Sequence, residues 1–150
     1  MKYFNDILLE FASDFKFADK TISEVWYSLC EEYRLEFEKV KKKIPFDLYL
    51  LIKETSLHDF IMEDIHVKTY HTAKRYCQDI MLSLCHIDDH YIITHKNVAQ
   101  FELQMTPNPY MLQYLYGEIL REGKQISHEF NFSYEGSCKI VCETLEFKKV

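Results

Sequence analysis

The sequence predicts an α+β fold in which N-terminal helices pack on one face of a five- or six-stranded antiparallel sheet. Apolar residues recur every three or four positions over about 2–55, as in amphipathic helices, and mostly every second position over about 58–148, as in strands. Helices followed by a run of hairpin-connected strands indicate α+β rather than alternating βαβ order. With 150 residues, 47% of them hydrophobic, the whole chain 1–150 is expected to form one domain around a single core.

Three helices are expected in the first part of the chain. The first carries an apolar stripe from Phe4 to Phe15. The second begins at Thr21-Ile22-Ser23-Glu24, a capping box in which the Thr and Glu side chains satisfy backbone N–H groups at the helix start, and it continues to Val40. Pro45 suits the first turn of a third, short helix that reaches Ile52.

The expected strands lie at 60–67, 76–86 and 91–95, and the last of these resumes over 101–105 after a bend at Asn97. The clearest strand runs from Ile126 to Tyr134, where apolar and polar residues alternate strictly. Gly123 and Gly136 bracket it and can supply the positive φ of hairpin turns. Its neighbours, 112–120 and 138–147, would complete a three-stranded meander.

The segment 109–121 has two interpretations. Asn108-Pro109 is a typical helix start. Tyr110, Tyr114 and Tyr116 favour a strand instead, and Gly117 would cost a helix about 1 kcal/mol relative to Ala. The strand is preferred, and the helix stays open as the alternative.

Composition narrows the class of protein. The net charge of −6 repels phosphate backbones, so no nucleic-acid binding is expected. No apolar run reaches membrane-spanning length and the N-terminus lacks a signal-peptide pattern, so the chain is expected to be cytoplasmic and without a membrane partner. The five cysteines form no CxxC pair, so no disulfide framework is predicted.

Motifs for catalysis are missing from the sequence. With three glycines there is no GxGxxG or Walker-type loop, and neither HExxH nor GxSxG occurs. A metal would find imidazoles at His86, His90 and His95, but such residues near a hairpin turn ordinarily face solvent and fix no ligand set. No catalytic residue, metal or cofactor is therefore assigned, and a non-enzyme is favoured over an enzyme.

Four residues are candidates for binding: Tyr114, Tyr116, Glu118 and His128. His128 lies on the apolar face of its strand, so it is either an acid or base in a pocket with Glu118 across the hairpin, or a buried imidazole bonded to a carboxylate or tyrosine. The buried imidazole is preferred. The two tyrosines fit an interface and cross-strand aromatic pairing equally well.

Several segments resemble a family of small, uncharacterised bacterial proteins. They are the Met-Lys-Tyr-Phe opening, His58-Asp59 before the first strand, Tyr114-Leu115-Tyr116-Gly117-Glu118-Ile119, and His128-Glu129-Phe130. The family pattern has Asp where this chain has Gly117, and Glu-Ile-His near Ser127-His128-Glu129. The resemblance implies a bacterial source and no known activity. Similar strand patterns occur among proposed immunity proteins of bacterial toxin systems.

The leading interpretation is a non-catalytic protein-binding module, with an immunity-type protein that neutralises a toxin as one form of it. The acidic charge suits a basic protein partner, since complementary fields speed association. The alternative is a small-ligand-binding protein or enzyme with a pocket around His128 and Glu118.

Overall fold

The computed structural model describes residues 1–3, 20–55, 57–105, 112–133 and 136–150. Its elements follow one another as two helices and then eight strands. They are α2 (Lys20–Val40), α3 (Phe46–Thr55), β1 (Ile61–His71), β2 (Tyr76–His86), β3 (Asp89–Lys96), β4 (Gln100–Gln104), β5 (Leu112–Glu122), β6 (Gln125–Phe132), β7 (Gly136–Cys142) and β8 (Thr144–Lys149). The predicted α+β class is confirmed. The predicted helix from Phe4 to Phe15 lies outside the described residues.

The eight strands form one antiparallel sheet in the order β4-β7-β6-β5-β1-β2-β3-β8. The sheet is larger than the predicted five or six strands because two expected strands are each divided by a bend. One bend follows β3, where Asn97 adopts a φ of 53°, and the other separates β7 from β8 at Glu143. The ambiguous segment is confirmed as a strand over Leu112–Glu122, and Gly123 has the expected positive φ of 62° in the turn that follows.

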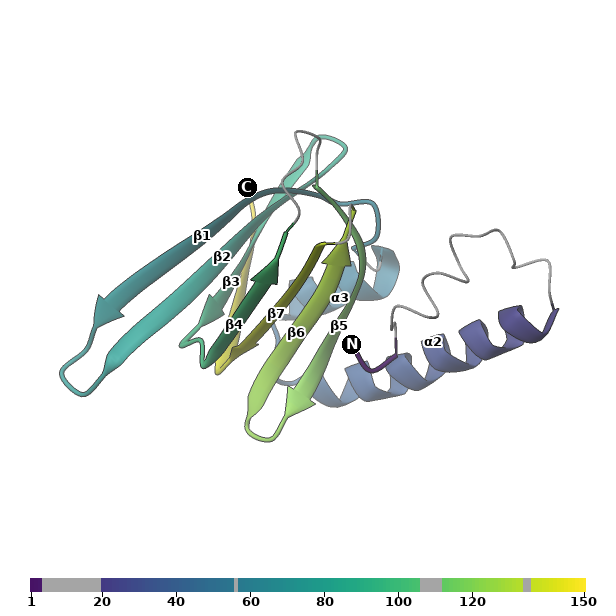
Figure 1. Cartoon of the computed structure of the whole chain (residues 1–150), viewed down its shortest axis with the longest axis horizontal. Helices are drawn as coiled ribbons and strands as arrows, with labels where there is room; N and C mark the ends of the chain where they lie inside the picture. Colours follow the sequence, from purple (N-terminus) through teal and green to yellow (C-terminus); the bar gives the residue numbers. More distant parts are fainter. Residues whose placement is uncertain (4–19, 56, 106–111, 134–135) are drawn as a thin grey trace.

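The sheet curls until its two ends meet (Figure 1). β4 continues β3 and β8 continues β7, so the β3–β8 ladder runs on into the β4–β7 ladder. At the bends, the Ala99 N–H donates to the Val141 carbonyl at 2.8 Å and the Glu143 N–H donates to the Lys96 carbonyl at 3.0 Å. The inner face of the sheet therefore encloses a core, and much of the outer face points to solvent.

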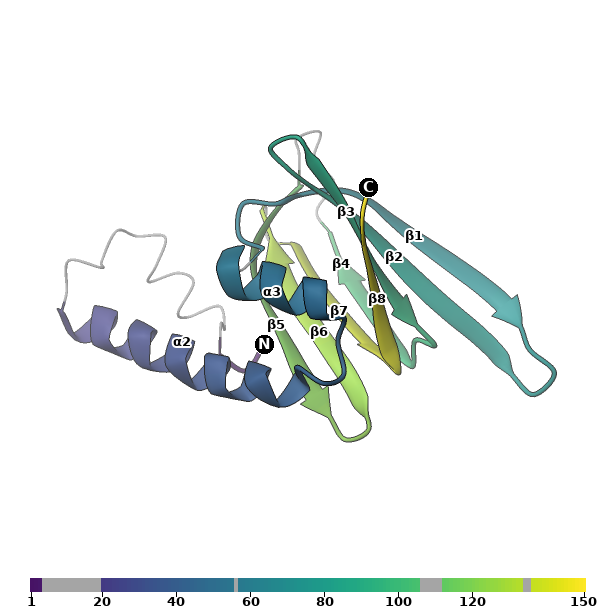
Figure 2. The ribbon, with the colours of Figure 1, turned by 180° about the vertical axis from the view of Figure 1, so that it is seen from behind.

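Both helices lie on one side of the sheet, as predicted (Figure 2). α3 buries Leu48, Tyr49 and Ile52 in the core. α2 lies along β5, where the Tyr33 hydroxyl accepts a hydrogen bond from the Ile119 N–H at 3.0 Å. This contact satisfies a backbone donor on the side of β5 away from β6.

β1 and β2 form a long ribbon that extends beyond the other strands in both views (Figures 1 and 2). β1 pairs with β2 along its whole length, but with β5 only at Ile61 and Met62. Most of β1 is therefore exposed, in contrast to β2, where inner residues such as Leu82 and Leu84 are fully buried. No helix in the described part of the chain is long and apolar enough to cross a membrane.

Candidate functional site

Two buried histidines and a buried tyrosine meet inside the sheet. His95 on β3 and His128 on β6 both have no exposed surface, and Tyr114 on β5 is 2% exposed. Nε2 of His95 lies 2.9 Å from Nδ1 of His128, and the Tyr114 hydroxyl lies 3.2 Å from Nε2 of His128. Two predicted site residues, Tyr114 and His128, are thus brought together, with His95 as a third member that the prediction had placed elsewhere.

The hydrogen bonds of this cluster have one consistent direction. Nδ1 of His95 lies 3.3 Å from the Ile80 carbonyl, which can only accept, so this nitrogen carries the proton. Nε2 of neutral His95 then accepts from the Nδ1–H of His128. Nε2 of His128 is left to accept from the Tyr114 hydroxyl. Both imidazoles are therefore neutral, and every ring nitrogen has a partner.

Burial holds the two imidazoles in the neutral form. Burial lowers the pKa of His95 from 6.5 to about 4, although the hydrogen bond to the Ile80 carbonyl opposes the shift. Burial also holds the pKa of His128 well below its usual value, and the adjacent His95 lowers it further. Burial raises the pKa of Tyr114 well above its usual value. A polar cluster with these properties stabilises and orients a core, and it has no contact with solvent through which a substrate would reach it.

Gly117 leaves room for the Tyr114 hydroxyl. A Cβ atom at this position would lie 1.7 Å from that oxygen and 2.9 Å from Cβ of Phe130. Gly117 does not have a positive φ, so this glycine is needed for close approach and not for an unusual backbone conformation.

Glu118 does not share a pocket with His128. In the β5–β6 ladder His128 pairs with Ile119, whereas Glu118 pairs with Glu129, so the two side chains point to opposite faces. Glu118 is 1% exposed, and its carboxylate accepts from the backbone N–H groups of Lys2 at 2.8 Å and Tyr3 at 2.5 Å. Its position is explained by holding residues 1–3 against the outer face of β5.

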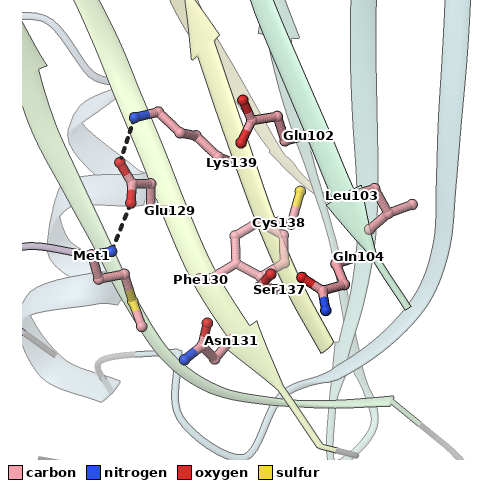
Figure 3. A pocket seen from close by; sticks show the side chains of 10 residues that line it. All are labelled: Met1, Glu102, Leu103, Gln104, Glu129, Phe130, Asn131, Ser137, Cys138 and Lys139. Carbon is pink, nitrogen blue, oxygen red and sulfur yellow. Dashed lines mark ion pairs between the residues drawn. The ribbon is translucent and has the colours of Figure 1, made fainter. Parts of the chain in front are cut away.

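A polar hollow of about 320 Å³ lies beside these residues on the outer face of β4, β6 and β7 (Figure 3). The Glu129 carboxylate lies at the edge of this hollow and forms two ion pairs, one with the Met1 amino group at 2.8 Å and one with Nζ of Lys139 at 2.9 Å. Glu102, which projects from β4, accepts a hydrogen bond from the Gln100 side-chain amide at 2.8 Å. The charged groups drawn in this hollow therefore already have partners. This polar hollow offers little apolar surface on which an apolar ligand would bind.

A second hollow, of about 430 Å³, lies between α2 and β5 and is called here the α2–β5 groove. Tyr116 lines it, with its ring 5.5 Å from that of Trp26 in an edge-on arrangement and 5.2 Å from that of His58. Eleven residues form the groove: Trp26, Cys30, Tyr33, Arg34, Phe37, Glu38, Ile52, Lys53, His58, Tyr116 and Gly117. Of the four predicted binding residues, Tyr116 is the one that lines this groove.

Sequence reasoning missed the helical half of this groove. Trp26 and Phe37 lie at helical spacing on the apolar side of α2, a pattern that by itself predicts a position in the core. Apolar residues of such a helix line a groove only where the helix is separated from the strand on which it packs. A single sequence contains no signal for the distance between a helix and the strand on which it packs.

The three histidines that were weighed as metal ligands and not assigned, His86, His90 and His95, do not come together. His95 is in the interior, His86 stacks on Phe60 at 4.5 Å, and His90 lies on the outer face, where it contacts Glu63. All five cysteines are free. Burial raises the pKa of the Cys138 and Cys142 thiols to about 12, so neither is a ready nucleophile.

The chain matches no family model, no curated protein and no solved structure, so its resemblance to small bacterial proteins stays a prediction and the case for a function depends on the geometry described above.

Proposed function

We propose that this protein is a non-catalytic protein-binding module that takes an aromatic or aliphatic side chain of a basic protein partner into the α2–β5 groove. The observation that carries the proposal is the groove itself, in which Trp26 and Tyr116 are in contact and partly exposed. Trp and Tyr are the residues most enriched at the energetic centres of protein interfaces, because a large apolar ring is combined with a polar tip.

The chemistry of the interior supports binding over catalysis. The side chains best suited to acid–base work, His95 and His128, are sealed in the core and neutral. Among the described residues, no buried side-chain nitrogen or oxygen lacks a hydrogen-bond partner. A core in which these described side chains are all hydrogen-bonded favours a rigid frame, and a rigid frame lowers the entropic cost of binding at a surface groove.

The charges around the groove suggest the sign of the partner. On α2, Glu24, Glu31 and Glu32 are exposed, and the chain as a whole carries −6. The lysine and the arginine side chain that line the groove both have acidic partners: Arg34 is held by Glu31 at 2.6 Å, and Lys53 lies 3.9 Å from Glu38. A partner that presents an apolar side chain flanked by Lys or Arg would therefore meet a complementary field. An immunity-type role, in which a basic toxin is sequestered, is one form of this function.

The test uses the chain as bait and Trp26, its only tryptophan, as the reporter. Pull-down from the source organism with the wild-type chain should recover a stoichiometric partner, and adding that partner should change the Trp26 fluorescence. The variants W26A and Y116A should weaken binding by at least about 2 kcal/mol each, the usual size for a central aromatic. Tyr27→Ala is the matched control, because Tyr27 adjoins Trp26 on α2 but is 71% exposed and lies outside the groove.

Binding that survives in W26A and Y116A would contradict the groove as the site. Turnover of a metabolite by the purified chain, with no stoichiometric partner recovered, would contradict the non-catalytic assignment.

A small apolar ligand is the second candidate, and the volume of the groove favours it. Ligand pockets commonly measure about 300–1,000 Å³ and are lined mainly by aromatic and aliphatic side chains, and the groove's 430 Å³ falls in that range. This version replaces the predicted pocket around His128 and Glu118, since those two side chains lie on opposite faces. Native mass spectrometry of the chain purified from its source would show a bound small molecule, lost in W26A, if this candidate holds.

A further inference from the structure

Three residues with metal-binding side chains meet on the outer face of the β1–β2–β3 part of the sheet. They are Glu63 on β1, Cys85 on β2 and His90 on β3. Cys85 and His90 are direct cross-strand partners, so their side chains lie next to each other on one face. None of the three lines the α2–β5 groove, and none belongs to the buried cluster of His95, His128 and Tyr114.

A β-bulge brings the third residue to this place. The β1–β2 register shifts between Met62 and Asp64, so Glu63 is the extra residue on the β1 side. Bulges re-aim side chains, and here the bulge directs the Glu63 carboxylate toward His90 on the far side of β2. Oε2 of Glu63 lies 3.1 Å from Nδ1 of His90.

The geometry suits a small metal ion. One ligand atom from each of the three side chains lies within 4.8 Å of the other two. In a tetrahedral zinc site, ligand atoms about 2.0–2.3 Å from the metal are separated by roughly 3.3–3.8 Å. Small side-chain rotations are therefore enough to close the site. Glu63 and His90 keep side-chain exposures of 40% and 51%, so an ion can reach them from solvent.

We propose that Glu63, Cys85 and His90 bind a zinc ion, with water as the fourth ligand. The donor set of one thiolate, one imidazole and one carboxylate matches Zn²⁺, whereas Mg²⁺ and Ca²⁺ prefer oxygen ligands alone. On binding, the Cys85 thiol releases its proton to solvent. The His90 proton moves from Nδ1 to Nε2, and the Nδ1 lone pair bonds to the metal in place of its contact with Glu63.

The test is titration of the purified full chain with Co²⁺ and then Zn²⁺. Cobalt bound to a thiolate gives a charge-transfer band in the near ultraviolet, so the wild-type chain should show this band with one Co²⁺ per chain, and Zn²⁺ should abolish it. C85S should lose the band. E63Q and H90Q should weaken binding by about tenfold or more, since loss of even an outer-shell partner costs about 10- to 100-fold in metal affinity.

Matched controls separate this site from other thiols and imidazoles. C30S removes a partly exposed cysteine on α2, and H66Q removes an exposed histidine on β1; both should bind Co²⁺ as the wild type does. The absence of a band in the wild-type chain, or a band that persists in C85S, would overturn the proposal. Because the three ligand residues are at the surface, urea unfolding should show that each variant is folded, and a variant that fails this check is replaced by C85A, E63A or H90A.

Discussion

As the pH falls, this protein should lose stability before its carboxylates take up protons, because His95 and His128 are buried in the neutral form. In the folded chain the pKa of His95 is lowered from 6.5 to about 4, and that of His128 is also well below 6.5. The unfolded chain therefore takes up these two protons first. The stability they provide is complete above about pH 6.5 and is lost as the pH falls from there toward about 4.

The size of the effect follows from the shift. For a histidine with a pKa of 6.5 unfolded and about 4 folded, the free energy of unfolding falls by about 2 kcal/mol between about pH 7 and pH 5. The pKa of His128 is lowered as well, so His128 adds to this loss in the same direction. Even the loss of about 2 kcal/mol from His95 alone is a substantial fraction of the about 5–15 kcal/mol that stabilises an ordinary domain.

Urea unfolding followed by Trp26 fluorescence, at several pH values between about 5 and 7, measures this dependence. We expect a slope approaching 2.7 kcal/mol per pH unit from two uncharged histidines, and about half of it in His128→Gln. His66→Gln, at an exposed position on β1, is the control and should keep the wild-type slope. Equal stability at the two ends of the pH range, or an unchanged slope in His128→Gln, would refute the argument that burial keeps this pair neutral.

Two further predictions concern residues that hold the same region together. Gly117→Ala should lower the free energy of unfolding by about 3 kcal/mol, because the new methyl group overlaps the Tyr114 hydroxyl. Gly123→Ala is its control: no atom lies within 4 Å but φ is +62°, so the loss should be about 1 kcal/mol. Equal losses in the two variants would contradict the close-approach explanation. Glu118→Gln should lower the free energy of unfolding by about 2 kcal/mol, because one of the two backbone N–H groups at Lys2 and Tyr3 then faces an amide donor. Glu122→Gln, at an exposed position, is the control and should leave the free energy of unfolding unchanged. Urea unfolding measures both variants.

Local pattern was enough to predict the class of fold and most strands. Alternation along Ile126, His128, Phe130 and Phe132 reports directly which side chains are buried, and the structure buries all four. The bend at Asn97 was also predicted, and it is confirmed by the φ of 53° at this residue. The bend at Glu143 was not predictable in the same way, because Glu143 is neither glycine nor proline and the bend exists because the sheet must curl to enclose its core.

The candidate site was harder to predict because it depends on register and on contacts between distant strands. The turn at Gly123-Lys124 aligns Ile119, and not Glu118, with His128. A difference of one residue moves a side chain to the other face of a strand. The contact between His95 and His128 joins β3 to β6, which are not neighbours in the sheet, so no periodicity within either strand could report it.

In the protruding β1–β2 ribbon, one edge of β1 pairs with β2 along the whole strand. On the opposite edge, the row of backbone groups beyond Met62 has no strand partner among the described residues. Such a row is a template on which copies of a protein stack into aggregates. Here the side chains along it include Glu63, Asp64 and Lys68, and the bulge interrupts its regular spacing. A second copy that added itself to this strand would have to accommodate these charged side chains and a distorted ladder, so the ribbon can reach into solvent while the protein resists self-association.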